Sequence, residues 1–200
     1  MHNGDAASMM GILLAAGRGS RFDPTGTQNK LLQQLPDGLC VAACAAKNLL
    51  AALPTVLAVV RPGQQDLASQ LRAVGCEVTV CSNADDGMAA SLVHALSHAA
   101  GAQGWVIGLA DMPYVQAKTI AALAAAIQSG ADIAVPTYHG QRGNPVAFSR
   151  THLSELLALR GDQGARQLLK TRPLIEVATD DPGITQDIDT ITDLLQMPQQ

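Results

Sequence analysis

A glycine- and arginine-rich segment follows the first apolar run of the chain. It reads Leu14-Ala15-Ala16-Gly17-Arg18-Gly19-Ser20-Arg21, and Lys30 lies nine positions beyond Arg21. Glycine lets the backbone turn its N–H groups toward an anion, and arginine and lysine match the charge of phosphates. A dinucleotide fingerprint would need a third glycine where Phe22 stands, and no Gly-Lys-Ser/Thr triplet of a Walker loop is present. The segment therefore predicts a phosphate site, with an ordinary tight turn and solvated arginines as the alternative.

Carboxylates that could bind a cation occur in two further segments. Asp111 lies in Leu109-Ala110-Asp111-Met112-Pro113, directly after an apolar run, where it would point into a crevice. Asp187 and Asp189 alternate near the C-terminus, so they share one side if that segment is extended. Carboxylate oxygens are ligands that Mg²⁺ accepts together with substrate phosphates. We expect a cation site if either of the two late aspartates approaches Asp111; turn formation and helix capping are the alternatives.

Three other segments carry polar groups that could contact a ligand. Asp86-Gly87-Met88-Ala89-Ala90-Ser91 begins a helical pattern, and helix N-termini bind anions. The glycine-rich segments 140–145 and 161–166 are interpreted as surface turns or as the site of a second substrate. His94 and His98 are four apart on one helix without a third ligand, so we expect them on the helix surface.

The elements that must position these residues alternate along the chain. Continuous apolar runs predict strands at 10–14, 55–60, 76–81, 105–110 and 132–136. Helical patterns occupy 41–53, 64–74, 88–100 and 116–128. Strands that are apolar throughout and separated by helices indicate an α/β protein with a parallel sheet covered on both faces. Ligands in such folds lie at the carboxyl ends of the strands. Short strands at 144–148 and 174–178, two helices between them and a C-terminal helix near 190–193 complete the prediction.

The bulk composition limits the class of protein. The chain has 200 residues, of which 48% are hydrophobic and 2% aromatic, so we expect a core of Ala, Leu, Val and Ile. We predict one domain, 10–200, after a flexible N-terminus, 1–9. The net charge of −4 argues against nucleic-acid binding. Without a signal peptide or an apolar stretch of roughly 20 residues, a cytoplasmic protein with no membrane contact is expected. The four cysteines, Cys40, Cys44, Cys76 and Cys81, are expected to be buried thiols.

Taken in order, these segments resemble the MobA/MocA-like nucleotidyltransferases over residues 11–194. That family has a Leu-Ala-(Ala/Gly)-Gly loop with Arg and Lys, then Leu-Ala-Asp-Met-Pro, Arg-Gly-(His)-Pro, Gly-Asp-x-Gly-Ala-Arg and Asp-Ile-Asp-Thr-Pro-Glu-Asp-Leu. This chain departs from it in the long gap between Arg21 and Lys30, in Asn144 at the histidine position, and in Ile191-Thr192 at Pro-Glu. The resemblance implies a Rossmann-like three-layer sandwich with a mostly parallel central sheet, similar to nucleotide-diphospho-sugar transferases.

The resemblance also implies a reaction. The pair Ala15-Ala16 and the Gly-Asp-x-Gly-Ala-Arg segment look like molybdenum cofactor cytidylyltransferase, which transfers CMP from CTP to the molybdopterin cofactor and releases pyrophosphate. CTP or GTP, the molybdopterin cofactor, and a molybdoenzyme or maturation factor are the implied partners. The alternatives are a guanylyltransferase, another small-acceptor or sugar-phosphate nucleotidyltransferase, and a non-catalytic molybdoenzyme partner with the same fold.

The site residues carried over by resemblance form four groups. Arg21, Lys30 and Asp111 would be catalytic, and Asp111 and Asp189 would hold Mg²⁺. The nucleotide would contact Leu14, Ala15, Ala16, Gly17, Arg18, Gly19, Gly87 and Ser91. The acceptor would contact Arg142, Gly143, Asn144, Asp162 and Gly164.

Overall fold

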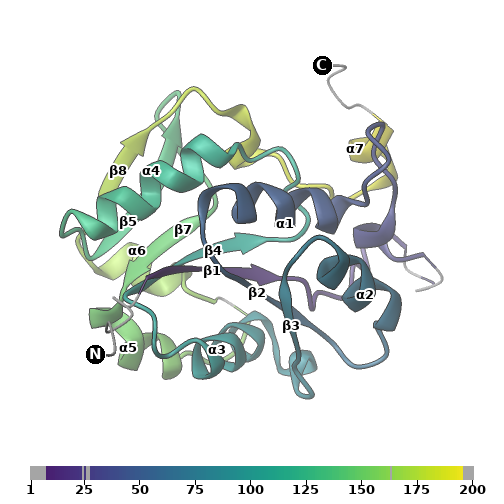
Figure 1. The fold of residues 1–200 in the computed structure, drawn as a ribbon, viewed down its shortest axis with the longest axis horizontal. Coiled ribbons are helices and arrows are strands. Elements are labelled where there is room, and N and C mark those ends of the chain that lie inside the picture. Colours follow the sequence, from purple (N-terminus) through teal and green to yellow (C-terminus); the bar gives the residue numbers. More distant parts are fainter. Residues whose placement is uncertain (1–7, 24, 26–27, 163, 196–200) are drawn as a thin grey trace, which may run out of the picture.

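The protein folds around one eight-stranded sheet with helices on both faces (Figure 1). The computed structural model describes residues 8–23, 25, 28–162 and 164–195. The strands are β1 (Met9–Leu14), β2 (Val56–Val60), β3 (Glu77–Val80), β4 (Gly104–Leu109), β5 (Ile133–Tyr138), β6 (Gln141–Arg142), β7 (Val146–Ser149) and β8 (Ile175–Ala178). Residues 1–7 of the predicted flexible N-terminus lie outside the described residues. Met9 already pairs with Gly104, so the first strand begins one residue earlier than predicted.

The sheet is mixed and mostly parallel. Its strand order is β3-β2-β1-β4-β7-β5-β6, and β8 pairs with β5. The first four strands in that order are parallel, as their apolar runs predicted. β7 is antiparallel to both β4 and β5. The change of direction begins at His139 and Gly140, whose φ angles of 49° and 77° fit the tight two-residue turn of a hairpin.

Helices cover the two faces of the sheet in separate layers (Figure 1). The α-helices are α1 (Val41–Ala52), α2 (Gln65–Ala73), α3 (Met88–His98), α4 (Ala117–Gln128), α5 (Leu153–Leu157), α6 (Arg166–Thr171) and α7 (Ile191–Leu195). One apolar cluster joins α1, α2 and α4 to the sheet, and a second joins α3, α5 and α6 to its other face. Leu13 belongs to the first cluster and Ile12 to the second, because successive side chains of a strand face opposite ways. The predicted α/β three-layer sandwich is confirmed.

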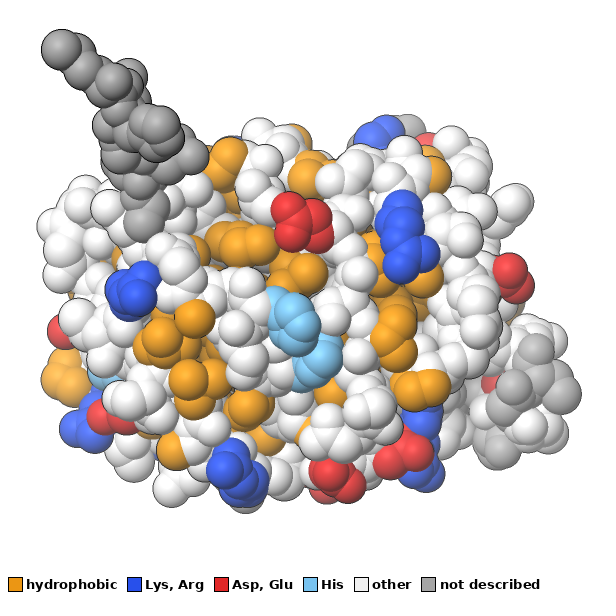
Figure 2. Space-filling view, turned by 60° about the horizontal axis from the view of Figure 1, so that its bottom comes forward, with side chains coloured by type: hydrophobic (Ala, Val, Ile, Leu, Met, Phe, Trp, Pro, Cys, Tyr) orange, Lys and Arg blue, Asp and Glu red, His pale blue; other side chains and the backbone are white. Residues whose placement is uncertain are grey.

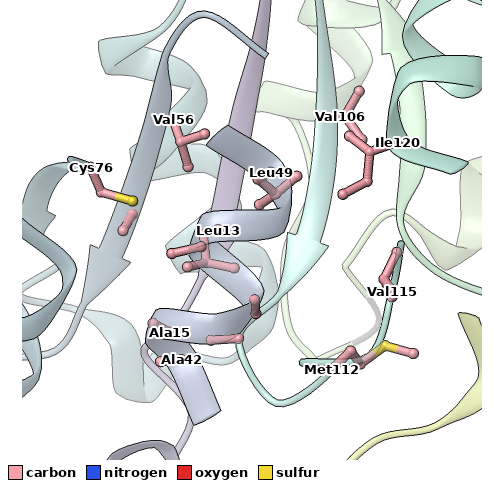
Figure 3. Close-up of a cluster of buried hydrophobic side chains, with 14 of the residues drawn as sticks. Leu13, Ala15, Ala42, Leu49, Val56, Cys76, Val106, Met112, Val115 and Ile120 are labelled. Atoms are coloured by element: carbon pink, nitrogen blue, oxygen red, sulfur yellow. The ribbon is translucent and has the colours of Figure 1, made fainter. Parts of the chain in front are cut away.

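Small side chains bring α1 close to the sheet. Leu13, Ala42 and Leu49 meet between β1 and α1 (Figure 3). A Cβ placed on Gly108 would lie 3.2 Å from Cδ1 of Leu49, which is tighter than ordinary contact. The core is built mainly from Ala, Leu, Val and Ile, as predicted. Trp105 and Phe148 are also buried, in the apolar cluster on the other face of the sheet. The cysteines are free thiols; three are buried and Cys44 is partly buried.

The molecular surface mixes charges of both signs. On the face shown in Figure 2, basic and acidic side chains are interspersed among separate apolar patches. Within the described part of the chain, none of the helices combines the length and the apolar character needed to span a membrane.

Candidate active site

A cavity of about 400 Å³ opens at the carboxyl edge of the parallel strands. Segments that follow β1, β3 and β4 form its walls, together with the start of α3 and two residues from the second half of the chain. Its lining residues are Leu14, Ala16, Gly17, Arg18, Gly19, Ser20, Arg21, Lys30, Leu31, Ala84, Asp85, Gly87, Met88, Ser91, Leu109, Asp111, Asp162 and Asp189. The structure thus brings together 12 of the 17 residues that the sequence predicted for the site.

Lys30, Asp111 and Asp189 meet at one point of this cavity. The Lys30 ammonium donates to Oδ2 of Asp111 at 2.7 Å and to Oδ1 of Asp189 at 2.8 Å. Only 11% of the Lys30 side chain is exposed, against 22% for each carboxylate. The other oxygen of Asp189 accepts from the Arg21 guanidinium. Two cationic side chains and two carboxylates from four separate segments therefore form one charged cluster.

The electrostatics of the cluster keep Lys30 charged. Burial lowers the pKa of Lys30, but the charge and hydrogen bond of Asp111, followed by those of Asp189, outweigh burial, and the pKa is raised overall. Asp187 behaves differently: burial raises the pKa of its carboxyl, and the nearby charge of Asp189 raises it further. Asp189, which hydrogen-bonds to Lys30, is therefore better placed than Asp187 to act with Asp111.

The long segment between Arg21 and Lys30 still delivers the lysine to the cavity. The Phe22 side chain is buried in the core, and its amide donates to the Gly19 carbonyl. Lys30 itself begins a 3₁₀ helix, Lys30–Leu32, whose N-cap Asn29 accepts from the Leu31 amide. Because Phe22 and Leu31 are both buried, they anchor the two ends of the segment, and its length does not displace Lys30.

A second charged cluster on the cavity wall was missed by the sequence analysis. Asp85 accepts from Arg18 at 3.1 Å and also from Arg61, which directly follows β2. The hydrogen bond from Arg18, with the charges of Arg18 and Arg61, holds the pKa of Asp85 below its usual value. The rule that ligands bind at the carboxyl ends of strands would have pointed to Arg61, since β2 is parallel to β1 and β3.

Gly87 lies where the two halves of the chain touch. Its φ is 109°, and a Cβ there would lie 2.4 Å from Oδ1 of Asp162 and 2.7 Å from the Gly161 carbonyl oxygen. The amide of Ala89 donates to that same carbonyl at 3.0 Å. Asp162, predicted to contact the acceptor, thus packs on a segment predicted to contact the nucleotide.

We predict that Gly87→Ala impairs both stability and nucleotide binding. The positive φ costs about 1–3 kcal/mol for a residue with a side chain, and the new methyl group would push the 161–162 segment away. Gly130→Ala is the matched control, because Gly130 has a φ of 104° with no atom within 4 Å of an added Cβ. Chemical denaturation should show a loss for both variants. Equal nucleotide affinity in the two would contradict the role given to Gly87.

The remaining predicted residues lie outside the cavity. Ala15 is buried in the core, and Arg142 is paired with Glu176 at the sheet surface. Gly143 packs against the Ile184 carbonyl, where a Cβ would come within 2.2 Å of the oxygen. Asn144 borders a separate small hollow together with Leu109, a residue that also lines the cavity. Gly164 packs against Met88. Of the predicted acceptor residues, only Asp162 lines the cavity, so their assignment stays a prediction.

The charges around the cavity suit a divalent cation. Its lining contains three cationic side chains and four carboxylates, so that its net charge is −1: Arg18, Arg21 and Lys30 against Asp85, Asp111, Asp162 and Asp189. A triphosphate brought into this lining adds several negative charges, which a bound cation would offset. Among the described residues, no three His, Cys, Asp or Glu side chains could hold an ion together. Mg²⁺ fits this donor set, because it usually binds one or two carboxylates and completes its shell with phosphates and water.

Known proteins resemble this chain over nearly its whole length. The model of the MobA-like NTP transferase domain matches residues 11–178. The purine catabolism protein PucB of Bacillus subtilis (strain 168) is 31% identical over 199 residues, which cover 91% of this chain and 92% of that protein.

Solved structures show the same architecture. The crystal structure of Rv0371c from Mycobacterium tuberculosis H37Rv superposes with a TM-score of 0.79 at 29% identity, covering 94% of this chain and 97% of that one. A structure of Rv0371c in complex with manganese gives a TM-score of 0.74, with the same identity and coverage. The fold, the ordered motifs and these similarities lead to one conclusion: the chain belongs to the MobA-like NTP transferase domain family and is a nucleotidyltransferase.

Proposed function

We propose that this protein is a Mg²⁺-dependent cytidylyltransferase of the cytoplasm that transfers CMP from CTP to the molybdopterin cofactor. The observation that carries the proposal is the convergence of Lys30, Asp111 and Asp189 at one point of the cavity. Cytidine specificity is supported by the resemblance of Ala15-Ala16 to the cytidylyl branch, and Ala16 lines the cavity. The manganese complex of the M. tuberculosis relative supports a divalent cation.

The proposed reaction needs no nucleophilic side chain. A terminal phosphate oxygen of the acceptor attacks the α-phosphorus of CTP, and the bond from that phosphorus to the β-phosphate bridging oxygen breaks, so that pyrophosphate leaves. A bound Mg²⁺ supplies charge neutralisation and orientation of the phosphates. Asp111 and Asp189 would hold it, while Lys30 and Arg21 would stabilise negative charge on the α-phosphate and on the leaving group.

The glycine- and arginine-rich segment at residues 14–21, which we name the Gly/Arg loop, would place the nucleotide for this attack. Gly17 has open space around the position of a side chain, and Gly19 has a φ of 64°, so the loop presents backbone at the cavity wall. Gly87 and Ser91, at the start of α3, would contact the nucleoside. Holding the reactants in line is a large share of catalysis in reactions of this type.

A thermal-shift panel with CTP, GTP, ATP and UTP, each with and without Mg²⁺, tests the proposal. We expect CTP with Mg²⁺ to raise the melting temperature most, because a ligand that binds only the folded state stabilises it. If GTP were the one nucleotide that raised the melting temperature, cytidine specificity would be overturned in favour of a guanylyltransferase. If no nucleotide produced a shift, the enzymatic proposal would fail, and a non-catalytic partner of a molybdoenzyme would be favoured.

A further inference from the structure

A buried aspartate outside the cavity anchors the segment that delivers Asp189. The segment, residues 181–189, which we name the return strap, leads from β8 to α7 (yellow in Figure 1). Asp181 at its start is 0% exposed. Its Oδ2 accepts from the Gln116 amide at 2.8 Å and from the Thr119 hydroxyl at 2.7 Å. Its Oδ1 accepts from the Gly183 amide at 2.9 Å.

Two further contacts hold the middle of the return strap. A Cβ on Gly183 would lie 2.3 Å from the Tyr114 carbonyl oxygen, so the strap passes directly against the turn that follows Asp111. The Ile184 carbonyl accepts from the Asn144 amide at 2.8 Å. These contacts join the strap to the segment after β4 and to the segment before β7.

The last contact of the return strap fixes the distance between the two carboxylates. The Ile188 amide donates to the backbone carbonyl of Asp111 at 2.9 Å, and the Ile188 side chain is buried. Asp189 is the next residue. The backbone of Asp189 is therefore held opposite Asp111 by contacts that begin with the Asp181 carboxylate and continue along the return strap.

We propose that Asp181 is a positioning residue for the divalent cation, acting through the return strap on the separation of Asp189 from Asp111. The inference rests on the proposed function, since it assumes that these two carboxylates hold the ion. The chemistry of Asp181 explains why an aspartate is required there. Its carboxylate accepts from three donors, whereas an asparagine amide would turn an NH₂ group toward at least one of them and leave that donor unpaired.

The test compares Asp181→Asn with Asp180→Asn. Asp180 is the neighbouring residue, exposed and paired with Lys118 at the surface, so it controls for the loss of one negative charge. Mn²⁺ affinity is measured by titration in the presence of CTP. We expect it to weaken about 10-fold in Asp181→Asn and to stay unchanged in Asp180→Asn. This is the lower end of the range for direct partners of metal ligands, because Asp181 acts on Asp189 through the return strap.

Hydrogen exchange separates positioning from a general loss of stability. We expect faster exchange at the amides of Gly183, Ile188 and Asn144 in Asp181→Asn, while the amides of β1 and β4 remain protected. The value of kcat should fall more than the affinity for CTP, because the return strap meets the Gly/Arg loop at Asp189, through the guanidinium of Arg21, and the nucleotide would be held mainly by the rest of that loop. Thr119→Val, which removes one donor to Asp181, should weaken Mn²⁺ binding in the same direction by less. Thr119→Val also tests the proposal if Asp181→Asn fails to fold.

Two results would overturn different claims. If Asp181→Asn and Thr119→Val bind Mn²⁺ like the wild type and only their melting temperatures fall, Asp181 is a structural residue and the positioning role is wrong. If the wild-type protein with CTP binds no Mn²⁺, the metal assignment of the proposed function is wrong instead.

Discussion

Asp111→Asn is expected to lower kcat by about 10²- to 10³-fold while the fold survives. Asp111 would hold the cation that stabilises negative charge in the transition state, and the loss of one such preorganised interaction has an effect of this size. The fold should persist because the contact between this segment and the return strap uses the Asp111 backbone carbonyl, which the substitution leaves in place. Steady-state pyrophosphate release, with circular dichroism on the same sample, measures both effects.

A matched control and a second variant sharpen this expectation. Asp66→Asn removes the same charge from the exposed surface of α2, and its rate of pyrophosphate release should equal that of the wild type. Asp189→Asn should resemble Asp111→Asn, and the double variant should lose much less than the product of the two single losses, because groups that act as a unit are not additive. Wild-type turnover in Asp111→Asn would contradict the metal assignment.

Lys30→Met should change catalysis and metal binding in opposite directions. Without the ammonium, kcat is expected to fall by about 10²-fold or more, since charge on the α-phosphate and pyrophosphate loses a partner. In the nucleotide-free protein, however, Mn²⁺ should bind about 10-fold more tightly. The ammonium of Lys30 hydrogen-bonds to both carboxylates, and a hydrogen bond to a charged group contributes about 1.5–3 kcal/mol that an incoming cation must replace.

The titration is best followed by the electron paramagnetic resonance signal of free Mn²⁺. Lys118→Met is the control, because Lys118 is exposed and paired with Asp180 away from the cavity. If Lys30→Met bound Mn²⁺ more weakly than the wild type in the absence of nucleotide, the lysine and the metal would not compete for the same carboxylates.

The fold could be predicted from the sequence wherever local pattern decides the structure. The apolar runs that end at Leu14, Val60 and Leu109 form strands, because a strand buried on both faces needs apolar residues throughout. The antiparallel direction of β7 could not be predicted in this way. A run of apolar residues has no direction, and the reversal depends on the turn at His139 and Gly140.

The candidate site was predictable in its main parts and not in its pairings. Asp111 was indicated by its place after a buried strand, and Asp187 and Asp189 by their alternation. Only the choice of Asp189 over Asp187 came from the family resemblance. The pairing of Arg61 with Asp85 joins segments that follow different strands, and that of Arg142 with Glu176 joins β6 to β8. Such pairs depend on strand order, which the chain sets through contacts between residues distant in sequence.

The central claim is that this protein transfers the nucleotidyl group of CTP, and the position of a phosphorus label tests it most directly. CTP labelled at the α-phosphate or at the γ-phosphate is incubated with the protein, Mg²⁺ and the molybdopterin cofactor, and the products are separated. We expect the α-label to appear in the acceptor and the γ-label in pyrophosphate. The γ-label in the acceptor, or both labels remaining in CTP, would contradict the claim.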